Sequence, residues 1–242
     1  MAHPQLIPRA RALALDFDGT LAREGVVAPE TTAALSRAIE RRVQLLLVTG
    51  RRLSSLAAAF PHLDLFERVV AENGAVLYEP RTKRSRILAP APDDSLLEAL
   101  RRAGVPFVVG HSVVATVRPF KQQVVAAIGD AGVRWHVAFN KNNLMILPVG
   151  VTKVTGLAPA LEELGIAPAE MAGIGDAEND LPFLSMCGIA IAVANAVPSL
   201  KAIADHVTVG ARGDGVIEAI TGLFNGGRGG RRRRACQRRS ER

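Results

Sequence analysis

The feature that most constrains the fold is a pair of apolar runs, each of which ends in polar residues. Residues 11–17 read RALALDF, and residues 43–50 read VQLLLVTG. A short run that is apolar at nearly every position is typical of a strand buried on both faces of a parallel sheet. The segment between them, residues 31–42, has apolar residues near the helical period. The chain therefore begins with a strand, helix, strand unit of an α/β fold.

The pattern changes in the middle of the chain. Between residues 81 and 148, short strands and two helical segments follow one another in a β(αββ)₂ order, which predicts a small sheet with helices on one face. The alternation of strands and helices then resumes. We therefore predict an α/β core with a parallel sheet, formed by residues 1–80 and 149–224, into which a smaller α+β domain at 81–148 is inserted.

The net charge of +7 comes from the C-terminal end of the chain. Residues 226–242 contain eight arginines and one glutamate, so the rest of the chain is close to neutral. A Gly/Arg segment has little apolar surface to bury, which predicts a disordered tail over 225–242 that can make weak contacts with nucleic acid phosphates. No apolar run reaches the roughly 18 residues of a membrane span, and the start lacks the apolar segment of a secretory signal. These features predict a cytoplasmic protein without membrane contact, and they leave the oligomeric state open.

Polar residues follow the strands or begin the helices of the predicted core. They are Asp16, Asp18, Thr49, Lys153, Asp176 and Asp180. The carboxyl ends of parallel strands meet at one edge of a sheet, so these side chains are expected to share a pocket. Carboxylates this close repel one another, and Mg²⁺ is the cofactor that would best compensate them. The hydroxyl of Thr49, the charge of Lys153 and the backbone N–H groups near Gly19 and Gly50 would bind a phosphate.

The two aspartates after the first strand are spaced for covalent phosphoryl transfer. The carboxylate of Asp16 can attack phosphorus and form an aspartyl-phosphate. Asp18, two residues later, can protonate the departing alcohol and then activate a water molecule. Together these residues predict the hydrolysis of a phosphomonoester.

Four segments of the sequence resemble the motifs of the haloacid dehalogenase (HAD) superfamily, in the same order. They are DFDGTLA at 16–22, VTGR at 48–51, Lys153, and GDAENDLPFL at 175–184. The NGA at 73–75 and the position of the insert resemble the Cof-type, or IIB, phosphatases of that superfamily. The resemblance implies a Rossmann-like core and a C2B-type cap domain.

The resemblance also implies roles for individual residues. Asp16 would be the nucleophile and Asp18 the general acid and base. Thr49 and Lys153 would bind the phosphate, and Asn179 would help to position it. The Mg²⁺ ligands would be Asp16, the backbone carbonyl of Asp18, and Asp176, with Asp180 in support.

The predicted cap supplies candidates for reading the substrate. They are Arg118, Asn140, Lys141 and Asn143. A solvated hairpin turn would account for most of the same residues, so this assignment stays open. A short cap suits a small phosphorylated substrate, and compact C2B-capped relatives act on phosphoglycolate or sugar phosphates.

Other functions would use part of the same pattern. A signalling receiver also accepts phosphate on an aspartate, but it lacks the second acid two residues later. A phosphomutase or phosphotransferase would use the same residues and return the phosphoryl group to a sugar. A non-catalytic phosphoacceptor, or a nucleic-acid-associated module acting through the basic tail, would not need both aspartates.

Overall fold

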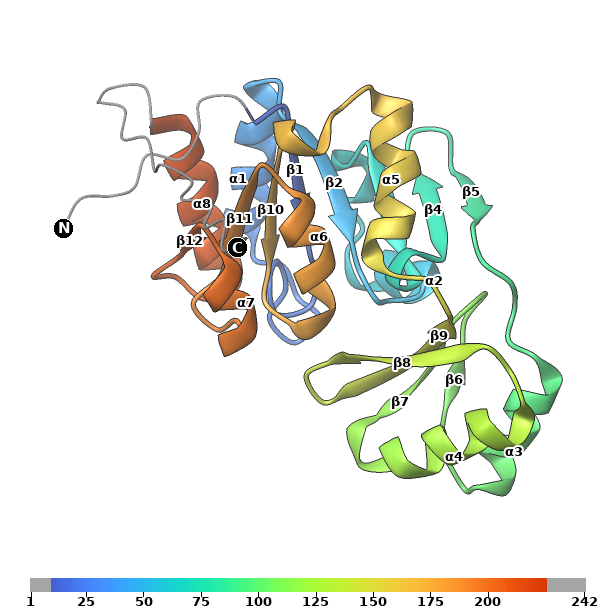
Figure 1. The fold of residues 1–242 in the computed structure, drawn as a ribbon. Helices are drawn as coiled ribbons and strands as arrows, with labels where there is room; N and C mark the ends of the chain where they lie inside the picture. The colour runs from blue at the N-terminus through green and yellow to red at the C-terminus, as the bar shows by residue number, and fades with distance from the viewer. Residues whose placement is uncertain (1–9, 226–242) are drawn as a thin grey trace, which may run out of the picture.

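A computed structural model describes residues 10–225 of the 242-residue chain. These residues form a large domain and a small domain, each built on its own sheet (Figure 1). The predicted arginine-rich tail at 226–242 lies outside the described residues. Within residues 10–225, no helix is long and apolar enough to cross a membrane.

The large domain, here called the core, contains an eight-stranded sheet in the order β12-β11-β10-β1-β2-β3-β4-β5. The strands are β1 (Ala12–Leu15), β2 (Gln44–Val48), β3 (Arg68–Ala71), β4 (Val76–Glu79), β5 (Arg84–Ile87), β10 (Met171–Gly175), β11 (Ile189–Ala192) and β12 (His206–Val207). The last two strands of the order, β4 and β5, run antiparallel to their neighbours, and the others pair in parallel. The predicted α/β fold with a largely parallel sheet is confirmed.

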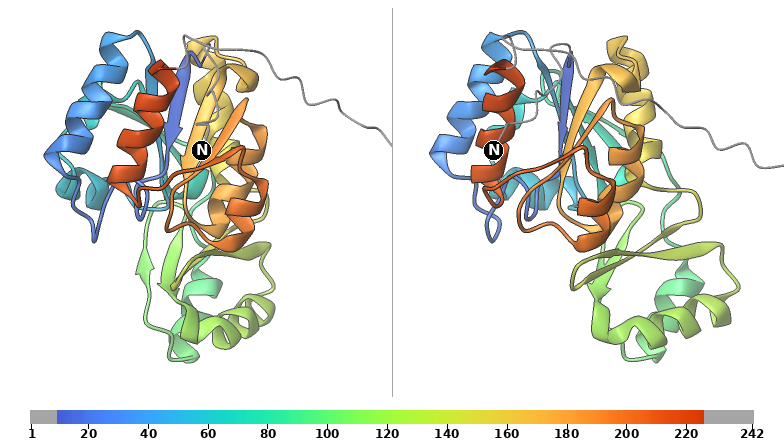
Figure 2. Two further views of the ribbon diagram at one scale, coloured as in Figure 1. Left: turned by 90° about the vertical axis from the view of Figure 1, so that its left-hand side faces the viewer. Right: turned by 60° about the vertical axis from the view of Figure 1, so that its left-hand side comes forward.

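Helices cover both faces of this sheet (Figure 2). One layer consists of α1 (Pro29–Glu40), α2 (Leu53–Ala59) and α8 (Gly213–Asn225), and the other of α5 (Lys153–Leu164), α6 (Leu181–Met186) and α7 (Pro198–Ile203). In β1, Leu13 and Leu15 belong to the first layer's core, and Ala12 and Ala14 to the second. Successive side chains of a strand point to opposite faces, so a strand between two helical layers must be apolar throughout.

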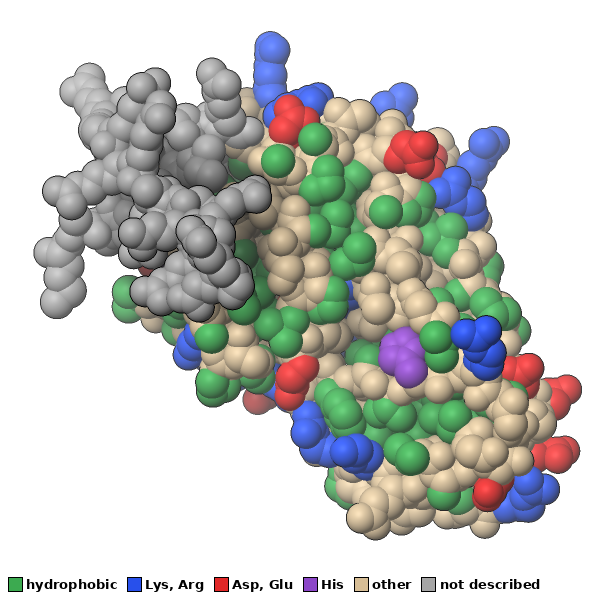
Figure 3. Space-filling view, in the orientation of Figure 1, with side chains coloured by type: hydrophobic (Ala, Val, Ile, Leu, Met, Phe, Trp, Pro, Cys, Tyr) green, Lys and Arg blue, Asp and Glu red, His purple; other side chains and the backbone are tan. Residues whose placement is uncertain are grey.

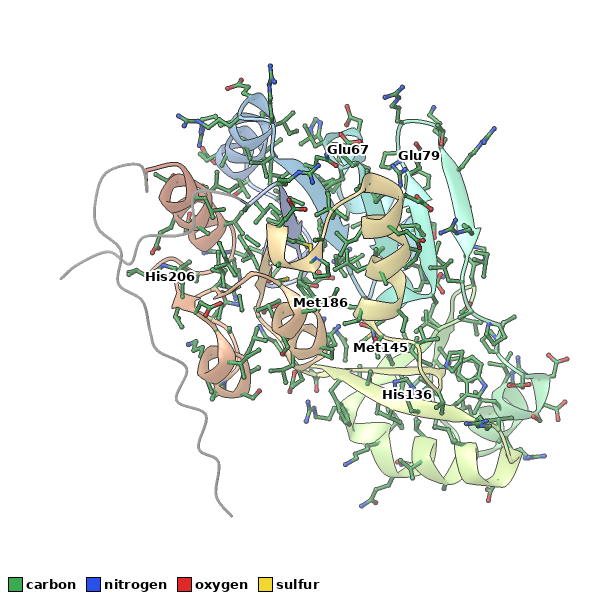
Figure 4. All side chains as sticks on the ribbon, turned by 45° about the horizontal axis from the view of Figure 1, so that its top comes forward. Glu67, Glu79, His136, Met145, Met186 and His206 are labelled. Atoms are coloured by element: carbon green, nitrogen blue, oxygen red, sulfur yellow. The ribbon has the colours of Figure 1, made fainter. Side chains whose placement is uncertain are left out.

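The small domain, here called the cap, contains a four-stranded antiparallel sheet in the order β6-β7-β9-β8. Its elements are β6 (Val108–Val109), β7 (Val114–Val117), β8 (Trp135–Asn140), β9 (Asn143–Pro148), α3 (Asp94–Arg102) and α4 (Lys121–Ala131). Trp135 and Ile146 lie in the apolar core between the helices and the sheet. The other face of the sheet, which carries Met145, is turned toward the large domain (Figure 4).

Short 3₁₀ turns lie between the helices and strands. They are η1 (Leu63–Leu65), η2 (Glu72–Gly74), η3 (Arg118–Phe120), η4 (Pro168–Glu170) and η5 (Glu178–Asp180).

The boundary of the inserted domain differs from the prediction. The strand at Arg84–Ile87 was expected to begin the insert, but it is β5, which pairs with β4 at the edge of the core sheet. All four of its residues are exposed, so its pattern carries no apolar signal that would assign it to either sheet. The cap therefore begins after β5 and not at residue 81, and its order is (αββ)₂.

Helix α5 approaches the turn between β3 and β4 so closely that one position has no room for a side chain. A Cβ atom at Gly156 would lie 2.6 Å from the Cα atom of Gly74 and 2.7 Å from its carbonyl oxygen. By contrast, nothing lies within 4 Å of a Cβ atom built at Gly129 in α4. This close packing positions the start of α5 against the edge of the core sheet.

We predict opposite effects for two glycine to alanine substitutions inside helices. Alanine is favoured over glycine by about 0.5–1 kcal/mol in a helix, so Gly129→Ala should raise the free energy of unfolding by about that amount. Gly156→Ala should lower it by about 1–3 kcal/mol, as overpacking does, because backbone atoms must move apart. Urea titrations followed by circular dichroism measure both, and equal shifts in the two variants would contradict the packing argument.

Candidate active site

The polar residues that follow the core strands meet at the end of the sheet where the parallel strands finish, here called the sheet edge. Asp16 follows β1, Thr49 follows β2 and Asp176 follows β10. Because β1 lies between β2 and β10, these three strand ends are neighbours. All three side chains are buried. The edge therefore combines ionisable groups with little access to solvent.

Lys153 is the buried cation of this edge. It is the first residue of α5, and its side chain is 0% exposed. Its Nζ donates hydrogen bonds of 2.5 Å to Oδ1 of Asp16 and to Oδ1 of Asp180. Burial lowers the pKa of Lys153, but the two carboxylates raise it by more, so the net shift is upward. The ammonium group therefore stays charged between two acids.

Asp16 has one carboxylate oxygen that is not engaged. Its Oδ1 accepts from Lys153, whereas Oδ2 is buried and has no hydrogen-bond partner among residues 10–225. Burial raises the pKa of Asp16, Asp180 adds to this effect, and Lys153 opposes it. Buried polar atoms in proteins are nearly always satisfied, so this oxygen is expected to meet a ligand.

Asp176 and Asp180 complete an acidic cluster with Asp16. Oxygen atoms of the three carboxylates lie within 4.8 Å of one another. Oδ2 of Asp180 accepts the N–H groups of Asp176 and Ala177 at 2.8 and 2.9 Å, so this side chain also holds the loop after β10. Oδ1 of Asp176 accepts from the hydroxyl of Thr20 at 3.2 Å. Closely spaced carboxylate oxygens, one of them without a partner, fit a cation that prefers oxygen ligands.

The carboxylate of Asp18 is engaged elsewhere. It accepts two hydrogen bonds from Arg51, at 2.6 Å from Nε to Oδ2 and at 2.7 Å from Nη2 to Oδ1. The same guanidinium lies 5.0 Å from the ring centre of Phe17. A bidentate pair of this kind fixes the orientation of both groups. Asp18 thereby lines a cavity of about 330 Å³ between the core and the cap.

Thr49, Gly50 and Asn179 lie beside the acidic cluster. The hydroxyl of Thr49 accepts the N–H of Arg51 at 3.1 Å. Nδ2 of Asn179 donates to Oδ1 of Asn73 at 3.0 Å, and a Cβ atom on Gly50 would lie 4.0 Å from this nitrogen. Oδ1 of Asn179 is buried without a hydrogen-bond partner in the described part of the chain. The structure thus brings the VTGR segment at 48–51 close to the GDAENDLPFL segment at 175–184. The phosphate-binding roles of these residues stay predictions.

The turn between β8 and β9 brings cations of the cap to the core. Lys141 donates from Nζ to Oδ2 of Asp176 and from its backbone N–H to Glu178. Arg118 donates to the carbonyl of Lys141 at 2.7 Å and to Glu178 at 3.1 Å. Figure 3 shows basic side chains at this end of the cap. The other two predicted cap residues, Asn140 and Asn143, line the cavity beside Asp18.

Asn195 was not singled out from the sequence. Its Nδ2 donates to the carbonyl of Gly19 at 2.8 Å and to Oδ2 of Asp176 at 3.2 Å, so it ties the first motif to the fourth. Asn195 lies in the loop after β11, which is the next strand along the same edge. The position after a parallel strand is the signal that could have identified it.

Glu72 was also missed, and it connects the core to the cap. Its side chain is 1% exposed, and its carboxylate accepts the N–H groups of His111 and Ser112 at 3.0 and 2.9 Å. A Cβ atom on Gly110 would lie 2.6 Å from Oε2 of Glu72, so the turn between β6 and β7 rests on this carboxylate. No local pattern could reveal it, because its partners belong to another domain.

Comparison with known proteins decides the family. A family model described as haloacid dehalogenase-like hydrolase matches residues 13–120 and 123–220. The chain belongs to this family. The HAD resemblance of its motifs is thereby confirmed, and the chain is a hydrolase of the HAD type.

Relatives and solved structures agree with this assignment. The chain is 31% identical over 225 residues to a phosphoglycolate phosphatase of Methanothermobacter thermautotrophicus, with 87% of this chain and 97% of that one covered. A phosphoglycolate phosphatase of Archaeoglobus fulgidus is 29% identical over 226 residues, with 88% and 96% covered.

Among solved structures, a Thermoplasma acidophilum protein has a TM-score of 0.78 at 17% identity, with 89% of this chain and 98% of that one covered. A HAD subclass IIB sugar phosphatase has a TM-score of 0.68 at 18% identity, with 82% and 93% covered. At such low identity these likenesses show a shared fold. They confirm the expected HAD-type core.

We predict that Lys153→Met strongly destabilises the metal-free protein. The substitution leaves the carboxylates of Asp16 and Asp180 buried without their cation, and removing one partner of a buried ion pair costs about 3–5 kcal/mol. Lys83→Met, at an exposed position between β4 and β5, is the matched control and should change stability little. Urea unfolding in the presence of EDTA measures the difference, and equal losses in both variants would contradict this account.

We predict that Glu72→Gln loosens the turn between β6 and β7. The side-chain amide can accept only one of the two N–H groups well, and an unsatisfied buried donor costs about 1–3 kcal/mol. Amide hydrogen exchange of His111 and Ser112 should therefore become faster. Glu98→Gln, on the exposed side of α3, is the control. Unchanged protection of the turn would show that the carboxylate does not hold the cap.

Proposed function

We propose that this HAD-type hydrolase is a Mg²⁺-dependent phosphomonoesterase that acts through an aspartyl-phosphate intermediate. The observation that carries the proposal is the buried, unpartnered Oδ2 of Asp16 in a carboxylate whose other oxygen is held by Lys153. Lys153 fixes the orientation of this carboxylate and supplies positive charge beside the place where a phosphate would bind. The free oxygen is then available as the nucleophile.

The first chemical step would be attack by Oδ2 of Asp16 on phosphorus. A bond forms between this oxygen and phosphorus, the bond from phosphorus to the leaving oxygen breaks, and the leaving oxygen takes a proton from Asp18. In the second step Asp18 accepts a proton from water as the water oxygen attacks phosphorus. The bond to Asp16 breaks, which releases inorganic phosphate and restores the carboxylate of Asp16 and the protonated form of Asp18. In the structure Arg51 binds both carboxylate oxygens of Asp18 at the wall of the cavity, so this pair would have to open before Asp18 carries a proton.

The donor set at the sheet edge fits Mg²⁺. Asp16 and Asp176 would hold the ion with the backbone carbonyl of Asp18, and Asp180 would support them through the loop after β10. When bound, the ion would neutralise negative charge on the transferring phosphoryl group. Asn195 and Thr20 contribute by fixing the carboxylate of Asp176.

The substrate we propose is a small phosphorylated metabolite, with phosphoglycolate or a sugar phosphate as the leading candidates. The support comes from the names of the relatives and from the modest cavity of about 330 Å³ beside Asp18. Arg118, Asn140, Lys141 and Asn143 remain our candidates for contacts between cap and substrate. A cytoplasmic location and nucleic-acid contact through the arginine-rich tail also remain predictions from the sequence.

The mechanism is tested by measuring phosphate release from phosphoglycolate with Mg²⁺. Asp16→Asn should abolish release because the side-chain amide is not a nucleophile, and Asp18→Asn should lower kcat about 10²–10⁴-fold, as loss of a general acid and base does. Removing Mg²⁺ with EDTA should also stop the reaction. Asp64→Asn, at an exposed position in η1, is the control and should leave the rate unchanged. Release by Asp16→Asn at the rate of the unaltered protein would refute the covalent mechanism.

A further inference from the structure

The cavity beside Asp18 has a partly apolar wall from the cap and a polar wall from the core. The apolar residues of the cap wall are Val108, Val113, Ala115 and Met145, and the cap also contributes the polar Thr116, Asn140 and Asn143. The side chains from the core are Asp18, Arg51, Arg52 and Ser55. A volume of about 330 Å³ is at the lower end of the range for small-molecule sites. A cavity of this size has room for a small leaving group.

The charges that line this cavity do not balance. Asp18 and Arg51 neutralise each other through their bidentate pair. Arg52 lines the same cavity, and within the described part of the chain it makes no ion pair. It donates one hydrogen bond, from Nη1 to the carbonyl of Val109, at the long distance of 3.4 Å. Among the charged side chains that line the cavity, Arg52 therefore has no ion-pair partner, and it also lines a neighbouring cavity of about 570 Å³ with Glu72 and Val109.

The position of Arg52 places this charge at the junction of the two domains. Arg52 immediately precedes α2 of the core, and its guanidinium reaches the carbonyl of Val109 in β6 of the cap. The side chain is only partly exposed. An ion pair formed in such a place is stronger than one in bulk water, because the effective dielectric constant is lower.

We infer that Arg52 selects phosphomonoesters whose leaving group carries a carboxylate. The inference rests on the proposed function and adds the class of substrate and the residue that reads it. The apolar wall of the cap would cover the carbon chain, and Arg52 would bind the carboxylate. Arg51 is not available for this role, because two of its nitrogen atoms already bind Asp18.

The test compares two substrates that differ in one group. Phosphoglycolate carries a carboxylate where 2-hydroxyethyl phosphate carries a CH₂OH group, so the ratio of their kcat/KM values measures recognition of the acid. Arg52→Gln should lower this ratio about 10- to 100-fold, mainly through KM for phosphoglycolate, because charge-assisted hydrogen bonds contribute about 1.5–3 kcal/mol. Arg52→Lys should recover part of the ratio, since it keeps the charge but not the planar fork.

Two further variants make the test specific. Arg102→Gln removes the same charge at the exposed end of α3, on the face of the cap sheet away from the core (Figure 1), and should leave the ratio unchanged. Lys141→Gln removes the charge of a different cation, in the turn between β8 and β9 of the cap. An unchanged ratio in Arg52→Gln, or a fall that occurs in Lys141→Gln instead, would overturn the inference while the hydrolase function stands. If the unaltered protein hydrolyses neither ester nor any other phosphomonoester, the proposed function fails and the inference fails with it.

Discussion

The contact of Lys153 with Asp16 and Asp180 is the interaction on which the rest of the site depends. An ammonium group that is 0% exposed is stable only because it lies between two carboxylates, and each of these acids would be costly to bury alone. The three residues come from the start of α5, the end of β1 and the turn η5. Their charges therefore hold three distant segments in register at the sheet edge. The close packing of Gly156 on Gly74 sets how near α5 can approach.

The cap is joined to this edge by polar contacts at two of its turns. The turn between β8 and β9 reaches the core through Lys141, beside which Arg118 of η3 also pairs with Glu178, and the turn between β6 and β7 rests on Glu72. Because β6 and β8 are the two edges of the cap sheet, these contacts lie on opposite sides of the cavity that contains Asp18. The ion pair of Arg118 with Glu178 is partly exposed and exchanges readily with water, whereas the carboxylate of Glu72 that holds the other turn is buried.

The sequence predicts the part of the site that depends on local pattern. Apolar runs at 11–17 and 43–50 identify buried strands, and the rule that the carboxyl ends of parallel strands meet is enough to place Asp16, Thr49 and Asp176 at one edge. Residues with tertiary roles could not be found in this way. Glu72 has its partners in another domain, and the exposed strand β5 carries no apolar face that would show which sheet it joins.

Arg51 and Arg52 illustrate this limit in two adjacent positions. Both carry the same charge and stand side by side in the sequence, but the backbone directs them differently at the start of α2. Arg51 is held by Asp18 and by the ring of Phe17, so its charge is directed at the loop after β1. Arg52 lines the cavity and makes no ion pair with another described residue. In our proposals the chemistry at phosphorus and the choice of leaving group thus involve neighbouring residues that only their contacts distinguish.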